Sequence, residues 1–481
     1  MTEGLDLHLG VDKGAGFVGR ALETSLREAI RSGRLHAGAR LPGSRSLAAD
    51  LGISRGTVVQ AYAQLIAEGW LTGTTGSGTR VADLPGPGPA TAGDDPAPAA
   101  ARLAVDLRPG RPDLSSFPRT DWASSVRHAL SAAAYEDLDY AEPAGLPVLR
   151  AAVAGYVTRA RGVRADAGAV VITAGFTPGL ALLGRVLHRL GMRAIATEDP
   201  GLGRHRDVLH AAGLATVPLE VGPGGADPDG LAPGGLAVRA VVLTPAHQYP
   251  RGVVLGARKR SGFADWARRE DGFIVEDDYD GEFRYDQQPV GAMQALAPDR
   301  IVFAGSTSKT LAPGMRLGWL VVPPALRVPL LEAMAELGAA VPAVQQLAMA
   351  DLIARGGYDR HIRRMRLAYR RRRAELARIA PLEGVAAGLH ALLPVESAER
   401  ERVLIARGRR AGVALHGLHA DGYWREPGGN RPAALIIGYA TPPPHAWSRA
   451  LEALAEVVQG NLSSSGLRSW TGRHLAWWAW Q

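Results

Sequence analysis

Lysine is scarce in this chain, and one lysine stands where an amine could do covalent chemistry. Of the 55 basic residues, only Lys13, Lys259 and Lys309 are lysines. Arginine cannot replace lysine where the amine must lose its proton and attack a carbonyl carbon. Lys309 follows the apolar segment IVFAG and lies among small hydroxyl residues in STSKT. Such a lysine is often a surface residue, but here it is also placed to attack a bound aldehyde.

An acidic cluster supplies a second chemical group. The segment GFIVEDDYDGEF predicts a buried strand that delivers Glu276, Asp277, Asp278 and Tyr279 at its carboxyl end. A carboxylate there can keep a pyridine nitrogen protonated, and a phenol two residues later shares its face of an extended chain. The alternatives are a solvated loop or a metal site. We expect no metal, because no histidine lies nearby in the sequence.

Two further elements could hold a phosphate. In VVITAGFTPGL a strand runs into a glycine turn and a helix, so the N–H groups of Gly175, Phe176 and Thr177 can bind an anion. Arg316 follows Lys309 by seven residues and offers a cation. An amine, an acid and a phosphate cradle together suit pyridoxal 5′-phosphate.

These groups need an α/β scaffold to position them. Short apolar runs such as AVVITAG, MRAIATED and RAVVLTP alternate with amphipathic stretches through the body of the chain. This alternation predicts a mostly parallel sheet with helices around it. A Pro-, Ala- and Gly-rich linker at 83–105 separates the body from a shorter N-terminal unit.

Composition excludes several classes of protein. The chain has 481 residues, 46% of them hydrophobic and 21% charged, which excludes a disordered or fibrous chain. It has no cysteine, which excludes disulfides, thiolate metal sites and cysteine nucleophiles. We see no signal peptide and no apolar run long enough to span a bilayer, so we expect a soluble cytoplasmic protein.

The N-terminal unit, residues 14–82, has the pattern of a winged helix-turn-helix. After a first helix, a short helix that Ser44 or Ser46 can cap ends at Gly52, and Ser54 can cap a second helix. The segment WLTGTTGSGTRVA then predicts two short strands around a wing tip. The formal net charge of the whole chain is +8, and this unit contributes about +4, which is consistent with phosphate contact. A winged helix used for protein contact is the alternative.

The motif LPGSRSLAADLGISRGTV makes this unit resemble the GntR-type winged-helix domain. The resemblance implies double-stranded operator DNA as a partner. It further implies that the DNA-binding residues are Ser44, Arg45, Ser54, Arg55, Gly56 and Thr57, with Gly76 in the wing.

The body resembles a fold-type I aminotransferase. The motifs follow in the order YAEPAGLPVLR, TAGFT, EDPGLGRHR, TPAHQYPRG, EDDYDGEFRY and STSKTLAPGMRLG. With the winged helix in front, the chain resembles the MocR subfamily of GntR-type regulators. The resemblance implies an aminotransferase-like domain at 106–461, with a large part at about 135–335 and a small part at about 340–461. HIRRMRLAYRRRR fits the linking helix of that subfamily.

Residue roles follow from the resemblance. Lys309 would carry the internal aldimine, Asp277 would pair with the pyridine nitrogen and Tyr279 with the 3-oxygen. The residues around the phosphate would be Gly175, Phe176, Thr177, Ser306, Ser308 and Arg316. Tyr140 would reach the phosphate of a neighbouring subunit, which implies a homodimer.

Some positions depart from the family pattern. Leu202 stands where an aromatic residue commonly stacks on the ring, and Arg251 replaces a hydroxyl residue. Phe176 and Thr177, with the proline after them, replace a glutamine-containing turn. Arg204, and less strongly Arg431, are candidates to bind the carboxylate of an effector.

Three functional hypotheses follow. The first is a transcriptional regulator that senses pyridoxal phosphate, or a small amine or amino-acid effector, through Lys309. The second is a working aminotransferase with a fused DNA-binding domain. The third is a DNA-binding scaffold whose cofactor pocket has decayed. The tail at 462–481 holds four tryptophans and is either a poorly ordered or locally docked tail, or a partner-binding segment.

Overall fold

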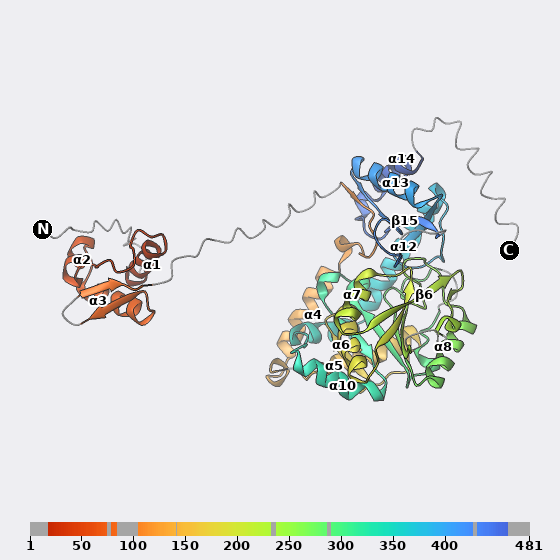
Figure 1. Cartoon of the computed structure of the whole chain (residues 1–481), viewed down its shortest axis with the longest axis horizontal. Helices are drawn as coiled ribbons and strands as arrows, with labels where there is room; N and C mark the ends of the chain where they lie inside the picture. Colours follow the sequence, from red (N-terminus) through yellow and green to blue (C-terminus); the bar gives the residue numbers. More distant parts are fainter. Residues whose placement is uncertain are drawn as a thin grey trace. The chain divides into compact units, whose positions relative to one another are not determined.

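A computed structural model describes residues 18–74, 78–83, 104–140, 142–231, 237–285, 290–426 and 431–459. The chain divides into two compact units, Met1–Arg102 and Leu103–Gln481, and each is described by itself (Figure 1). Most of the predicted linker, the wing-tip residue Gly76 and the predicted tail at 462–481 lie outside the described residues. Across the described part of the chain, no helix is long and apolar enough to cross a membrane.

In its described residues, the first unit has three helices and a two-stranded antiparallel sheet, as the sequence predicts. The elements are α1 (Val18–Arg31), α2 (Ser44–Leu51), α3 (Arg55–Ala67), β1 (Leu71–Thr74) and β2 (Gly78–Val81). Their apolar faces meet in one core that includes Leu22, Leu26, Val58, Leu65 and Val81. This small core positions the start of α3 at the surface of the unit.

Helix capping in this unit agrees with the sequence at one helix and differs at the other. The Ser54 side chain accepts a hydrogen bond from the Thr57 N–H at 3.0 Å and so caps α3. Gly52 ends α2 in the left-handed conformation. The expectation that Ser44 or Ser46 caps α2 was wrong. The N-cap residue is Gly43, which has no side chain to accept a hydrogen bond.

The body is built on a mostly parallel sheet. Its strand order is β4-β11-β10-β9-β8-β5-β6-β7, in which β11 and β7 are antiparallel to their neighbours. The strands are β4 (Val170–Thr173), β5 (Ala194–Asp199), β6 (Ala215–Gly222), β7 (Gly225–Ala226), β8 (Ala240–Leu243), β9 (Phe273–Asp277), β10 (Ile301–Ser306) and β11 (Gly318–Val321). Most residues of the central strands are buried, which explains their continuous apolar runs.

Helices cover both faces of this sheet (Figure 1). One apolar core contains Leu183 and Val186 of α6 with Val275 of β9, and another contains Phe263 of α8 with Ile274 of the same strand. The helices of this part are α4 (Arg119–Ala132), α5 (Pro147–Arg161), α6 (Phe176–Arg189), α7 (Gly203–Ala211), α8 (Ala257–Arg269), α9 (Thr307–Thr310), α10 (Pro324–Glu336) and α11 (Ala343–Ala354).

A smaller part follows the long helix α12 (Gly357–Ile379), which contains the arginine-rich segment noted in the sequence. A three-stranded sheet runs in the order β12-β15-β14, and β13 pairs with β3. The remaining elements are β3 (Val105–Asp106), β12 (Ala391–Val395), α13 (Ala398–Arg410), β13 (Val413–Ala414), β14 (His416–Gly417), β15 (Ala433–Ile437) and α14 (Trp447–Gln459).

Two expected boundaries differ from the structure. Met349 and Leu352 of α11 lie in the same apolar core as Val170 and Trp319 of the large sheet, so the large part extends beyond residue 340. Val105 belongs to strand β3, so the linker expected to reach 105 ends earlier. The first of these boundaries depends on long-range packing, whereas the Pro-, Ala- and Gly-rich composition of the linker already ends at Ala101.

Candidate active site

A cavity of about 380 Å³ opens where the carboxyl ends of the sheet strands meet. Its volume lies within the range that small-molecule sites in proteins occupy. Ten of the residues proposed from the sequence line this one cavity: Gly175, Phe176, Thr177, Leu202, Asp277, Tyr279, Ser306, Ser308, Lys309 and Arg316. They follow four different strands, which shows why an α/β sheet gathers groups that are distant in sequence.

Lys309 lies in the short helix α9, directly after strand β10. Its Nζ donates a hydrogen bond to the Gly110 carbonyl oxygen at 2.6 Å. Burial lowers the pKa of the Lys309 amine, although the negative charges of Asp277 and Asp280 act to raise it. A lower pKa increases the neutral fraction of the amine, which is the form that attacks a carbonyl carbon.

The acidic cluster divides between different partners. Asp277 ends β9 in the cavity, and burial raises the pKa of its carboxyl well above the ordinary range, although Lys309 opposes this. Asp278 instead makes a buried ion pair with Arg161 at 2.6 Å. Glu276 accepts hydrogen bonds from backbone N–H groups of Met293 and of the next residue. The solvated-loop alternative is therefore wrong, and Asp277 is the one acid of the three that lines the cavity.

The phosphate cradle expected from the sequence has the geometry of a helix N-terminus. Gly175 caps the fourteen-residue helix α6 with φ of 101°, a conformation that residues with a side chain rarely adopt. Hydroxyl groups of Thr177, Ser306 and Ser308, together with the Arg316 guanidinium, line the same cavity. Backbone N–H groups, hydroxyls and a cation are the donors that a phosphate group accepts.

Several lining residues were not found from the sequence. His205, on the first turns of α7 after Leu202, has its ring centroid 5.0 Å from that of Phe176. Burial, and then the charge of Lys309, lowers the pKa of His205 to about 4, so its ring is neutral. An aromatic surface thus lies beside Leu202. His205 follows Leu202 by three residues, and this helical spacing was the sequence signal that could have placed the two side chains together.

Other unpredicted groups come from both parts of the body. Glu198, Arg206, Tyr249, His390 and Tyr423 line the cavity. The hydroxyl groups of Tyr249 and Tyr423 lie 2.9 Å apart and join the large part to the small part. Sequence reasoning missed these residues because the places of Glu198, Arg206 and Tyr249 in the cavity depend on tertiary packing, as does the approach of His390 and Tyr423 from the small part.

Some predicted residues do not line the cavity. Tyr140 is fully exposed, and Arg204 is exposed as well. Arg431 donates to Asp199 at 3.2 Å and stacks over Trp424. Arg206, two residues after Arg204, does line the cavity and donates to the Gly201 and Gly422 carbonyl oxygens.

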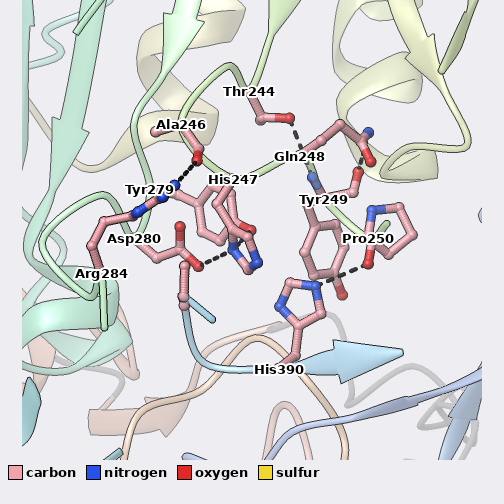
Figure 2. Close-up of polar contacts among 12 residues, drawn as sticks. Thr244, Ala246, His247, Gln248, Tyr249, Pro250, Tyr279, Asp280, Arg284 and His390 are labelled. Atoms are coloured by element: carbon pink, nitrogen blue, oxygen red, sulfur yellow. Dashed lines mark hydrogen bonds and ion pairs between the residues drawn. The ribbon is translucent and has the colours of Figure 1, made fainter. Parts of the chain in front are cut away.

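The sequence argument against a metal was that no histidine lies near the acidic cluster, and this argument fails in the folded protein. His247 and His390 lie beside Asp280, and one potential ligand atom of each residue falls within 4.8 Å of the others (Figure 2). All three are buried and already bonded: His247 Nδ1 to Asp280 at 2.9 Å, and His390 Nε2 to the Pro250 carbonyl at 3.0 Å. The fold brings these two histidines, which are distant in sequence, next to Asp280.

In the first unit, the residues expected to bind DNA lie at the beginnings of α2 and α3. Arg45 and Arg55 are exposed, and Tyr62 of α3 donates to the carbonyl of Pro42, just before α2, at 3.0 Å. The surface comprises Ser44, Arg45, Ser54, Arg55, Gly56 and Thr57. Such a surface offers N–H groups and guanidinium groups to a nucleic acid.

The fold and the cavity together define a helix-turn-helix regulator joined to an aminotransferase-like body. The gntR family of bacterial regulatory proteins matches residues 19–81, and aminotransferase class I and II matches residues 112–385. The chain belongs to the GntR-type regulators that carry an aminotransferase class I and II domain, the MocR subfamily. Membership in the aminotransferase class implies pyridoxal 5′-phosphate as the cofactor, and the donor set of the cavity fits it.

Two relatives span nearly the whole chain. The probable rhizopine catabolism regulatory protein MocR of Rhizobium meliloti is 33% identical and covers 93% of this chain and 94% of its own. The pyridoxine biosynthesis transcriptional regulator PdxR of Corynebacterium glutamicum is 32% identical and covers 87% of this chain and 91% of its own.

Among solved structures, an archaeal alanine:glyoxylate aminotransferase superposes with a TM-score of 0.67 at 22% identity, covering 76% of this chain and 92% of its own. Thermus thermophilus aspartate aminotransferase gives 0.63 at 22% identity, covering 74% and 92%. These two likenesses show the fold.

Proposed function

We propose that this protein is a transcriptional regulator that binds operator DNA through its first unit and senses pyridoxal phosphate, or a small amine, through Lys309. The observation that carries the proposal is the convergence of Lys309, Asp277 and Tyr279 on one cavity in a chain that also presents the α3 surface. The names of the relatives, regulators of rhizopine catabolism and of pyridoxine biosynthesis, support a regulatory role.

Each lining residue has a proposed task toward the cofactor. When bound, pyridoxal phosphate supplies an aldehyde that can be joined to a primary amine. Lys309 provides that amine, Asp277 holds the proton on the ring nitrogen, and Tyr279 bonds the 3-oxygen. The phosphate is held by the cradle of Gly175, Phe176, Thr177, Ser306, Ser308 and Arg316. Leu202 packs against the ring face beside His205.

We also propose a homodimer. Tyr140 is fully exposed, and Leu130, Tyr135 and Leu138 nearby in the sequence are also exposed. Exposed apolar side chains close together in a chain commonly mark a protein interface. In this arrangement Tyr140 would complete the phosphate site of a second copy.

The effector is proposed to be a small amine or amino acid. Arg204 and Arg431 remain proposed partners for its carboxylate, and Arg206 joins them because it lines the cavity. Single alanine variants of Arg204 and Arg206 separate these roles. The variant that weakens the response to amino acids, and not to simple amines, identifies the carboxylate partner.

The test of the regulatory function is DNA binding to the region upstream of the chain's own gene. Fluorescence anisotropy of the full-length protein should show specific binding whose affinity changes when pyridoxal phosphate or an amine is added. The Lys309→Ala variant should still bind but lose this change. Equal affinity for operator and unrelated DNA at physiological salt would contradict the proposal.

The second candidate is an active aminotransferase. It is favoured by the complete set of amine, acid and phenol in the cavity. Its test is amino transfer from amino acids to keto acids, measured by product formation. Repeated turnover without specific DNA binding would make the enzyme the better description of the protein.

A further inference from the structure

A buried pair of polar residues lies directly behind Tyr279. His247 follows strand β8 and Asp280 follows β9, and their side chains are 2% and 1% exposed. His247 Nδ1 is 2.9 Å from Asp280 Oδ2 and 3.1 Å from the Tyr279 hydroxyl oxygen (Figure 2). Tyr279 lines the cavity, whereas neither His247 nor Asp280 does. The pair therefore reaches the ligand site through Tyr279 and through His390, which also lines the cavity and whose ring centroid lies 5.0 Å from that of His247.

The hydrogen-bond chemistry of this group fixes the direction of each bond. A carboxylate accepts hydrogen bonds and cannot donate them, so His247 Nδ1 must carry the proton that it shares with Asp280. The same nitrogen then has no lone pair for the Tyr279 hydroxyl. Toward His247, the phenol oxygen can only accept. The single phenol proton is left either for the Asp280 carboxylate, which also acts on this hydroxyl as a hydrogen-bond partner, or for an acceptor in the cavity that Tyr279 lines.

We propose that Asp280 and His247 are positioning residues that keep Tyr279 a hydrogen-bond donor toward the ligand in the cavity. The inference rests on the proposed function, because the acceptor it assigns is the 3-oxygen of pyridoxal phosphate. It adds two residues that never touch the cofactor and explains why a histidine and an acid are buried together there.

The surroundings hold the pair in this arrangement. His390 Nε2 donates to the Pro250 carbonyl oxygen at 3.0 Å, so this N–H does not compete for Asp280. Burial, and then the adjacent His247, lowers the pKa of His390 to about 3, so its ring stays neutral. A Cβ at Gly388 would lie 2.3 Å from Asp280 Oδ2 and 2.4 Å from His247 Nδ1, so only glycine fits against the pair.

Tyr279 itself stays protonated. Burial, and after it the charge of Asp280, raises the pKa of its phenol well above the ordinary value. Tyr249 and Asp277 are the other ionisable groups that act on it, and Lys309 acts on the two acids Asp277 and Asp280. These groups must be considered together when the pH dependence of the site is measured.

Asp280→Asn in the full-length, cofactor-loaded protein is the central test. An amide at this position can donate to Nδ1, which frees that nitrogen from its proton and lets His247 take the opposite tautomer. The readout is the pH midpoint of the visible absorption band of the bound cofactor. The deprotonated form of the bound cofactor concentrates negative charge on its 3-oxygen. Losing a hydrogen-bond donor to that oxygen disfavours this form, so the pH midpoint of the band should rise by about one pH unit. Loss of the Asp280 charge alone would lower it instead.

A double-mutant comparison separates this role from a merely structural one. Tyr279→Phe should raise the midpoint by a similar amount, and adding Asp280→Asn to it should change little more. His247→Asn, which keeps an N–H near the position of Nδ1, should retain the wild-type midpoint. Thermal melting and cofactor uptake identify any variant that does not fold.

Distinct results would overturn the inference. If the wild type shows a normal band but Asp280→Asn leaves the midpoint unchanged or lowers it, the inference is contradicted while the proposed function stands. A further shift of the same size in the Tyr279→Phe background also contradicts it. One equivalent of zinc bound by the wild type and lost in His390→Ala would overturn it, because a metal-bound Nδ1 carries no proton. Absence of any visible band in the wild type would overturn both this inference and the proposed function.

Discussion

The two units of this chain place their functional groups in opposite ways. The proposed DNA surface comes from a short stretch between Ser44 and Thr57, and its two arginines are exposed. The cavity gathers residues from Pro109 to Tyr423, and its central acid, Asp277, is buried. A surface built from local residues can lose one side chain without losing its fold. In the cavity, chemistry and stability depend on the same buried groups.

The largest expected effect tests whether the cavity chemistry depends on one lysine. Lys309→Ala should abolish the visible absorption of the bound cofactor, because no other lysine lines the cavity among the residues that the structure describes. Lys259→Ala is the matched control, since Lys259 donates to the Gly225 carbonyl and does not line the cavity. Borohydride reduction followed by peptide mass spectrometry checks the attachment site. Loss of the band in Lys259→Ala, or its persistence in Lys309→Ala, would contradict the assignment.

The next effect concerns the exposed surface alone. Arg55→Ala should weaken operator binding by about 10- to 100-fold if Arg55 contacts a base, as one good contact contributes about 1–3 kcal/mol. The cofactor band and thermal stability should not change, because Arg55 is exposed. Arg31→Ala removes the same charge from α1, where Arg31 stacks over Trp70, and should weaken operator binding far less. Equal losses in the two variants would indicate general electrostatics instead of a specific contact.

A buried acid of the cavity offers a test that depends on pH. Burial raises the pKa of Glu198 to about 7, above its value of about 4.5 in an unfolded chain. The folded protein therefore keeps the Glu198 proton up to a higher pH than the unfolded chain does. The contribution of Glu198 to stability is fully present below about pH 4.5 and is lost as pH rises through 7. Glutamine stays neutral, so Glu198→Gln should match the wild type near pH 4.5 and be more stable by about 1–3 kcal/mol at pH 8.

Urea unfolding across this pH range measures the difference. Glu336→Gln is the control in the same unit, because Glu336 is exposed and its hydrogen bond from Arg189 lowers the pKa of its carboxyl. That variant should gain no stability at high pH. An advantage of Glu198→Gln that is equally large at both ends of the range would contradict the assignment to burial.

The same contrast explains how much could be predicted from the sequence. The three helices, the wing strands and the Ser54 cap follow from local spacing and capping chemistry, and the structure confirms them. The parallel sheet and the convergence of Asp277 with Lys309 followed from strand patterns and a family resemblance. Tyr423, His390 and Glu198 were missed, because their places in the cavity depend on how distant segments pack. The same cause hid the two histidines that lie beside Asp280.

The smallest expected effect lies in the first unit and tests whether structure and recognition can be separated there. Ser54→Ala removes the side-chain acceptor of the Thr57 N–H and should cost about 1 kcal/mol of stability in this unit. Amide hydrogen exchange in the full-length protein should show faster exchange at the start of α3 and no change in the body. Ser46→Ala is the control, because Ser46 lies within α2 and caps nothing.

Ser54→Asp sharpens the same comparison. Aspartate also accepts the Thr57 N–H, so the stability of α3 should be retained. Its negative charge would face DNA phosphates if this surface binds DNA, so operator affinity should fall while hydrogen exchange stays at the wild-type rate. If Ser54→Asp binds the operator as well as the wild type does, the start of α3 does not approach the phosphates. The surface would then be separable from DNA recognition, and the contrast between the two units would need another explanation.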